Sequence, residues 1–305
     1  MQRTGLNGVH SSAERTKRSR LAGAGAVVSR AKTGSVTKKL GATQRSAIRP
    51  VLPAQAHEHE KDAHLPIWNE ALFGAELLLL HASPVYYGLG VPHGDGSAVV
   101  VIPGFLGTDV YVTHLNSWLR RIGYRAHFSG IGINADCPNL LIQYRVAQTI
   151  DLARAESGRK VHLIGHSLGG LIARSVAAQR PNDIASVTTL AAPFRKSIVH
   201  HSVFHAAKEV RRNILNEHGP RVSAHCYTSR CTCDFVNFLR CQLPKSITQT
   251  SIYTRHDGIV DWQYCRSGHP NTDFEVSGTH IGLVFNPSVY SIIAERLAWI
   301  DSHTR

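Results

Sequence analysis

Residues 165–170 read Gly-His-Ser-Leu-Gly-Gly and directly follow the short apolar run 161–164. This G-x-S-x-G pattern, at a junction between a strand and a helix, is typical of a tight turn that exposes a serine hydroxyl. A serine attacks a carbonyl efficiently only when a nearby base removes its proton. We expect glycine at positions 165 and 169 because the strand and the helix approach closely there. Ser167 is the candidate nucleophile, and an ordinary serine in a strand-to-helix turn is the alternative.

A second glycine-rich turn, at residues 103–109, follows the continuous apolar run 97–102, which predicts a buried strand. Attack on a carbonyl requires main-chain N–H groups that stabilise the developing oxyanion, each contributing about 3 kcal/mol. Leu168, the residue after the serine, is the natural first donor. The second donor is expected in the glycine-rich turn, where we favour Phe105 and keep Leu106 as the alternative.

A carboxylate and a histidine follow later in the chain, in an order that suits the serine. Residues 250–254 predict a strand, and the turn after it contains Asp257, with Asp261 as the fallback. The chain has nineteen histidines, but His280 stands out because it completes the order Ser, Asp, His. His166 is a poor candidate for the base, because a residue beside such a serine usually points away from the hydroxyl.

Five segments stand in the order seen in one known family: IPGFLGTD, GHSLGG, TLAAPF, SIYTRHDGIVDW and SGTHIGLVFNP. The chain resembles α/β-hydrolases of the bacterial esterase and lipase type from Ala98 to Leu297, about two thirds of its length. The early turn departs from the family pattern, because it has Pro103-Gly104 where many lipases have His-Gly.

This resemblance implies a role for each candidate residue and requires no metal ion or organic cofactor. The implied roles are nucleophile for Ser167, base for His280, orienting acid for Asp257, and oxyanion donors for Phe105 and Leu168. The reaction it implies is hydrolysis of a small-molecule or lipid ester through an acyl-enzyme. An acyltransferase, lactonase or thioesterase using the same triad is the alternative, and a non-enzymatic protein on this scaffold is a further one.

The pattern of elements independently predicts an α/β fold with a doubly wound, mostly parallel sheet and helices on both faces. The expected strands are 98–102, 125–128, 161–164, 186–190 and 250–254, with helical stretches between most of them. In such a sheet ligands bind at the carboxyl ends of the strands, where all the candidate residues fall.

Between about residues 194 and 248 the alternation of strands and helices stops, which predicts a cap or lid insertion. Its apolar residues either line an acyl pocket or pack the cap onto the core, and we favour packing. The cysteines are dense here, which favours one or two disulfides over free thiols; they are Cys226, Cys231, Cys233 and Cys241, with Cys265 as a further partner. Cys137 has no obvious partner.

The net charge of +13 is concentrated at the N-terminus. Residues 1–50 contain eleven Lys and Arg and one acidic residue, a balance of +10 that leaves +3 for the rest. We therefore predict a disordered basic segment over residues 1–60 and a hydrolase domain over 61–305. No specific nucleic-acid partner is expected; transient contact with a membrane surface or lipid interface is the alternative role of the tail.

No segment predicts a membrane span, and no clear signal peptide precedes the domain. Residues 67–81 (IWNEALFGAELLLLH) are too short to cross a bilayer and are expected to pack on the domain as a helix. Both a cytoplasmic and an exported location are compatible with these features, and the sequence predicts no particular oligomeric state.

Overall fold

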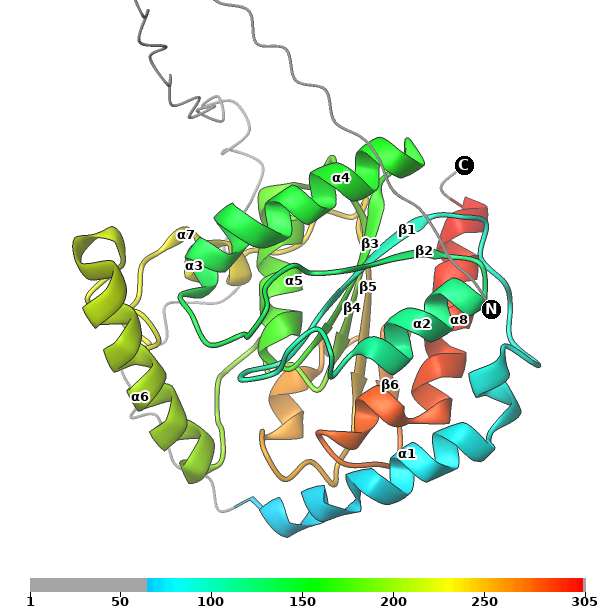
Figure 1. The fold of residues 1–305 in the computed structure, drawn as a ribbon, viewed down its shortest axis with the longest axis horizontal. Helices are drawn as coiled ribbons and strands as arrows, with labels where there is room; N and C mark the ends of the chain where they lie inside the picture. The colour runs from blue at the N-terminus through cyan, green and yellow to red at the C-terminus, as the bar shows by residue number, and fades with distance from the viewer. Residues whose placement is uncertain (1–64, 304–305) are drawn as a thin grey trace, which may run out of the picture. The chain divides into compact units, whose positions relative to one another are not determined.

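The computed structural model describes residues 65–303, so the predicted basic segment 1–60 lies outside the described residues. Six strands form one sheet in the order β2-β1-β3-β4-β5-β6, and every neighbouring pair is parallel (Figure 1). The strands are β1 (Ala98–Ile102), β2 (Arg125–Phe128), β3 (Val161–His166), β4 (Ile184–Leu190), β5 (Thr248–Tyr253) and β6 (Asp273–Glu275). The predicted α/β class with a mostly parallel sheet is confirmed.

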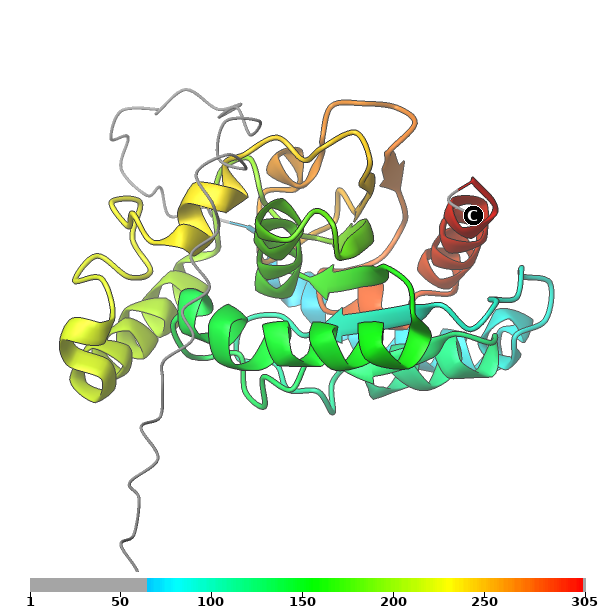
Figure 2. The same cartoon turned by 90° about the horizontal axis from the view of Figure 1, so that it is seen from above.

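Helices cover both faces of this sheet. The α-helices are α1 (Phe73–Ala82), α2 (Thr113–Arg121), α3 (Pro138–Leu141), α4 (Ala147–Ser157), α5 (Leu168–Gln179), α6 (His201–His218), α7 (Asp234–Leu239) and α8 (Pro287–His303). Buried side chains of α4, α5 and α7 form one core with the sheet, and those of α1, α2 and α8 form another. Seen from above, α8 and α7 lie on opposite sides of the strands (Figure 2).

The apolar patterns explain which strands could be predicted. All five residues of β1 are buried, as a central strand of a parallel sheet requires. β1 and β2 have the predicted bounds, whereas β3 extends two residues further, through His166. β6 was not predicted, because its three residues, Asp-Phe-Glu, are partly exposed and carry no apolar run.

Because the strands are parallel, their carboxyl ends share one edge of the sheet. The turn at 103–107 follows β1, Ser167 follows β3, and residues 254–260 follow β5. The loop that contains His280 follows β6. The sheet therefore brings segments far apart in the sequence to one place.

The segment between β4 and β5 contains α6, the 3₁₀ turn η5 (Gly219–Arg221) and α7. Phe235 of α7 packs with the core on the α5 side, and Ser175 of α5 donates a hydrogen bond of 2.9 Å to its carbonyl. Within residues 65–303, none of the helices combines the length and the apolar character that crossing a membrane requires.

The expected disulfides are absent, because all six cysteines are free thiols. The sulfurs of Cys231 and Cys233 are 3.4 Å apart, well beyond the ~2.05 Å of a disulfide bond. Cys265 is buried in a separate cluster with Tyr253 and Val260. Cys137, expected to lack a partner, packs with Cys226 in a small buried cluster.

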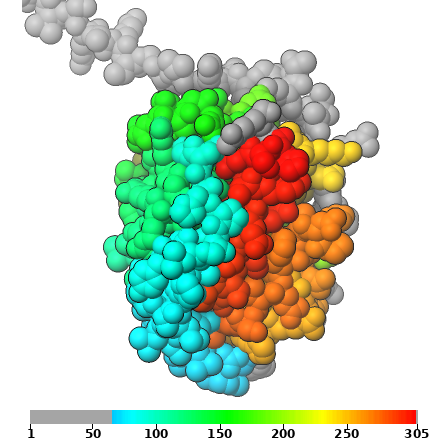
Figure 3. Space-filling view, turned by 90° about the vertical axis from the view of Figure 1, so that its right-hand side faces the viewer, coloured from blue at the N-terminus to red at the C-terminus, as the bar shows by residue number. Residues whose placement is uncertain are grey.

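The N-terminal helix packs on the domain as expected, but the side chains it buries are acidic rather than apolar. The 3₁₀ turn η2 (Ile67–Leu72) leads into α1, and this segment lies along the C-terminal third of the chain (Figure 3). Its acidic side chains, Glu70 and Glu76, are buried, whereas Trp68, Leu78 and other apolar residues are exposed. The acidic residues therefore face inward.

Candidate active site

Ser167 occupies a strained turn between β3 and α5. Its φ is 51° and its ψ is −121°, a conformation that a residue with a side chain rarely adopts. The turn is held because the Ser167 N–H donates to the carbonyl of Leu190 on β4, at 2.8 Å. Ser167 is partly exposed, while its neighbours on β3 are buried. The turn thus presents the hydroxyl at the carboxyl edge of the sheet.

The glycines around this turn are required by close backbone contacts, as predicted. A Cβ on Gly165 would overlap the carbonyl oxygen of Gly169, and a Cβ on Gly169 would overlap that of Ile102. Gly104, in the turn after β1, is also tightly packed, because its Cβ would lie 2.8 Å from Nδ1 of His166. Any side chain at these positions would push α5 or the early turn away from β3.

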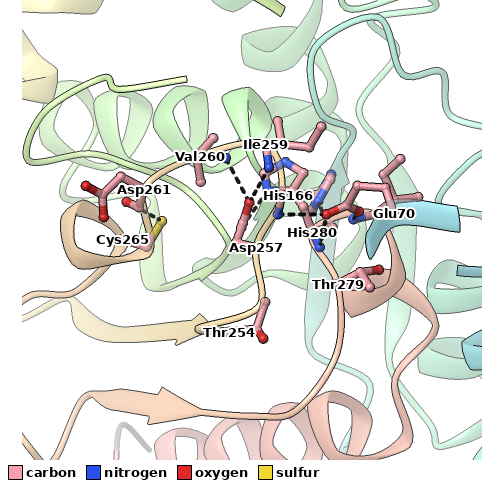
Figure 4. A network of polar contacts seen from close by, with 12 residues as sticks. Glu70, His166, Thr254, Asp257, Ile259, Val260, Asp261, Cys265, Thr279 and His280 are labelled. Carbon is pink, nitrogen blue, oxygen red and sulfur yellow. Dashed lines mark hydrogen bonds and ion pairs between the residues drawn. The ribbon is translucent and has the colours of Figure 1, made fainter. Parts of the chain in front are cut away.

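Asp257 and His280 form a buried pair (Figure 4). Nδ1 of His280 lies 2.7 Å from Oδ2 of Asp257, while Oδ1 accepts the N–H groups of Ile259 at 2.9 Å and Val260 at 2.8 Å. A carboxylate can only accept, so Nδ1 carries the proton and Nε2 of the neutral ring has a free lone pair. Asp261, the fallback candidate, instead accepts the N–H of Gln263 at 3.0 Å.

Ser167 and His280 line one cavity of about 730 Å³, together with both proposed oxyanion residues, Phe105 and Leu168. Within the described part of the chain, neither the Ser167 hydroxyl nor Nε2 of His280 has a hydrogen-bond partner inside the protein. Both groups are therefore available to a molecule in the cavity. The structure brings all five sequence-predicted site residues to this place, with Asp257 behind the histidine.

The turn after β1 distinguishes the two candidate donors. The N–H of Leu106 is occupied by the carbonyl of Asn134, at 2.9 Å. Among residues 65–303, no backbone carbonyl accepts the N–H of Phe105, and the N–H of Leu168 lies in the first turn of α5, where helical partners are missing. Phe105 and Leu168 therefore have the free donors.

Asn134 is a residue that the sequence analysis missed. It is fully buried, and its Nδ2 donates to the carbonyl of Pro103 at 2.8 Å. Its backbone carbonyl accepts from Leu106, and its own N–H donates to Gly107 at 2.9 Å. Asn134 thus fixes the turn that contains Phe105. No local signal in the sequence marked it, because it lies in an irregular loop.

His166 is a second missed residue. Its ring is buried, borders the cavity and lies 4.8 Å from the His280 ring, centroid to centroid. Its Nε2 donates to the carbonyl of His280 at 2.9 Å, because a carbonyl can only accept. Burial, with a smaller effect of His280, lowers the pKa of His166 to about 3. His166 is neutral at ordinary pH and holds the loop of His280 through this hydrogen bond.

Within residues 65–303, no group of three or more His, Cys, Asp or Glu side chains is arranged to bind a metal ion. The polar residues that line the cavity are Ser167, His280, His166, Tyr111, Ser197 and Ser202. Around them the lining is mostly apolar, from Leu171, Val203, Phe204, Ile259 and Phe285 among others.

Comparison with known proteins agrees with this architecture. Residues 142–219 match the family model described as the alpha/beta hydrolase fold. The chain is 35% identical over 135 residues to a triacylglycerol lipase of Burkholderia plantarii, covering 41% of this chain and 37% of that one. It is 37% identical over 108 residues to a triacylglycerol lipase of Pseudarthrobacter phenanthrenivorans, covering 32% and 34%.

The chain thus spans just over a third of the length of these curated relatives. Among solved structures, it is similar to a monoacylglycerol lipase of Paleococcus ferrophilus, at 17% identity and a TM-score of 0.45, over 69% of this chain and 97% of that one. The family match within 142–219 includes the serine turn at the end of β3 and the helix that follows it. In this part of the chain the protein is similar to the alpha/beta hydrolase fold family, and its parallel sheet has the matching α/β architecture.

Proposed function

We propose that this protein hydrolyses carboxylic esters through Ser167, His280 and Asp257. The observation that carries the proposal is the strained turn of Ser167, which opens into the same cavity as a histidine paired with a buried aspartate. Strain of this kind persists only where the surrounding structure enforces it, and it is concentrated at functional sites. The lipase names of the relatives add support for esters as substrates.

The reaction follows from the free groups. Nε2 of His280 takes the proton of Ser167 as the hydroxyl oxygen attacks the ester carbonyl carbon. The N–H groups of Phe105 and Leu168 stabilise the oxyanion. His280 returns the proton to the departing alcohol, which leaves an acyl-enzyme, and a water molecule then releases the acid by the reverse route. Asp257 holds the imidazole in the required tautomer and stabilises its charged form.

The apolar cavity suits an acyl chain. Val203, Phe204, Ala206 and Ala207 of α6 line it, and α6 belongs to the segment between β4 and β5. In our proposal this segment is a cap that covers the serine and excludes water from the reacting ester.

The test is hydrolysis of p-nitrophenyl esters from acetate to palmitate by the wild type and by Ser167→Ala. Ser302→Ala, an exposed serine on α8, is the matched control. We expect turnover to fall by three orders of magnitude or more in Ser167→Ala and to be unchanged in Ser302→Ala. Turnover retained by folded Ser167→Ala would refute the triad. A folded wild type inactive on every chain length, but active once an acyl acceptor is added, would instead identify an acyltransferase.

A further inference from the structure

Glu70 is a buried carboxylate outside the proposed triad, and it contacts both loops that supply triad residues. Its side chain is 6% exposed. Oε1 accepts the N–H of Gly258 at 2.9 Å and that of His280 at 3.0 Å, and Oε2 accepts the N–H of Ile281 at 2.8 Å. Figure 4 shows Glu70 reaching the backbone beside His280. One side chain therefore joins the turn after Asp257 to the loop of His280.

A second carboxylate from the same segment reaches the same loop. Oε1 of Glu76 accepts the N–H of Thr279 at 2.9 Å, and Oε2 accepts the Thr279 hydroxyl at 2.7 Å. Burial, together with the charge of Glu70, raises the pKa of Glu76 above its usual value. Three consecutive residues, 279–281, thus donate their backbone N–H groups to two glutamates of the N-terminal segment.

Glycines in the turn after Asp257 and in the loop of His280 make room for these two carboxylates. A Cβ on Gly258 would lie 3.0 Å from Oε1 of Glu70 and 2.6 Å from the carbonyl of Pro66. A Cβ on Gly278 would lie 2.6 Å from Oε1 of Glu76, and one on Gly282 would overlap that carboxylate. Glycine beside Asp257 and on both sides of His280 is therefore what leaves room for the N-terminal segment.

Burying the Glu70 carboxylate is costly unless the N–H groups of Gly258, His280 and Ile281 compensate for the lost water. A buried carboxylate loses much hydration, and hydrogen bonds from backbone N–H groups compensate for that loss. Asn69 adds a bond of 3.3 Å from Nδ2 to the carbonyl of His256, so the segment also contacts the start of the Asp257 turn. The donors fix Glu70, and Glu70 in turn fixes the separation of the two loops.

We propose that Glu70 is a positioning residue that holds His280 and Asp257 at the separation and orientation that catalysis requires, with Glu76 supporting the loop of His280. This inference rests on the proposed function. Because Glu70 bridges the two loops, its loss changes the Asp257–His280 geometry, and a displacement of about 1 Å in an active site can reduce turnover about 100-fold.

The experiment compares Glu70→Gln in the full chain with Glu295→Gln, an exposed glutamate on α8. The amide is almost isosteric but turns an NH₂ group toward backbone N–H donors. A fluorophosphonate titrates the reactive serine, so kcat is expressed per titrated site and is independent of any unfolded fraction. We expect this kcat to fall at least about tenfold with KM changed by less than about threefold. We also expect amides in 254–260 and 277–285 to exchange hydrogen at least about tenfold faster.

A purely structural role predicts fewer titratable sites with an unchanged kcat per site, and that result would overturn the proposal. If Glu70→Gln does not fold, Glu70→Asp keeps the charge on a shorter arm and is expected to show intermediate kcat and exchange. Wild-type values of both in Glu70→Asp would also refute the proposal. Failure of the proposed function would appear separately, as turnover retained by Ser167→Ala, whereas hydrogen exchange does not depend on the reaction.

Discussion

Asp257 and Asp261 lie four residues apart, yet only Asp257 directs a carboxylate oxygen to His280, with 2.7 Å between Oδ2 and Nδ1. Its other oxygen accepts two backbone N–H groups, from Ile259 and Val260. The carboxylate is therefore fixed at both oxygens and cannot rotate without losing hydrogen bonds. Asp261 accepts only from the short 3₁₀ turn that follows it.

Asp257→Asn is expected to reduce kcat by about 10³–10⁴-fold. The backbone donors hold the amide oxygen on their side, so the NH₂ group faces Nδ1 of His280. That contact favours the tautomer with the proton on Nε2, which cannot accept the serine proton. Ester hydrolysis at saturating substrate measures the loss, and circular dichroism verifies the fold.

The matched control is Asp261→Asn, for which we expect kcat within about threefold of wild type, because its carboxylate only caps a surface turn. A silent Asp257→Asn combined with an inactive Asp261→Asn would reverse the assignment of the acid.

Gly169→Ala is expected to lower the free energy of unfolding by about 3 kcal/mol or more, because the new methyl group overlaps the carbonyls of Ile102 and Pro103. Those atoms are backbone and cannot move aside cheaply. Gly74→Ala is the control, since a Cβ there meets nothing within 4 Å and alanine favours a helix by up to about 1 kcal/mol. Urea denaturation measures both. Equal stability of the two variants would show that α5 can shift away from β1.

The serine turn could be predicted from sequence because its requirements are local. Gly165, Ser167 and Gly169 lie within five residues, and a Cβ on Gly165 would overlap the carbonyl oxygen of Gly169 within the same turn. The same applies to β1, whose continuous apolar run predicts burial on both faces. Parallel strands then place the turns after β1, β3 and β5 at one edge without further information.

The hydrogen bonds from the N-terminal segment to the loops at the carboxyl edge of the sheet could not be predicted. They depend on contacts between residues distant in the sequence. The sequence predicts that residues 67–81 pack on the domain as a helix, but not that Glu70 is buried while Leu72 is exposed. Nothing local shows that three backbone donors await Glu70, because those donors belong to loops about 190–210 positions later. The expected disulfides failed similarly, since dense cysteine spacing does not determine the direction of each side chain.

Asn134→Ala is expected to lower both stability and kcat. The carbonyl of Pro103 loses its donor, a cost of about 1–3 kcal/mol for a buried acceptor. The turn that contains Phe105 then loosens, so we expect kcat to fall roughly 10- to 100-fold, less than the loss of an oxyanion donor outright. Asn182→Ala, at an exposed position, is the control. If Asn134→Ala loses stability but keeps full kcat, the oxyanion donor does not depend on this turn.

His166 provides a test based on pH. Its pKa in the folded protein is lowered to about 3, whereas the value in an unfolded chain is close to 6.5. Between these values the unfolded chain binds more protons than the folded protein does. The free energy of unfolding therefore falls as the pH decreases from about 6.5 toward 3, and the contribution of His166 is fully present only above this range.

His166→Gln removes this titration while keeping a side-chain N–H donor for the carbonyl of His280. We expect the free energy of unfolding of the variant to change less between pH 7.5 and pH 5 than that of the wild type, as measured by urea denaturation across this range. His205→Gln, an exposed histidine on α6, is the control and should keep the wild-type slope. Other buried titrating groups contribute equally to all three proteins, so the difference in slope isolates His166. An unchanged slope in His166→Gln would mean that His166 becomes protonated in the folded protein, which its burial opposes, and that the His280 loop does not rest on a neutral imidazole.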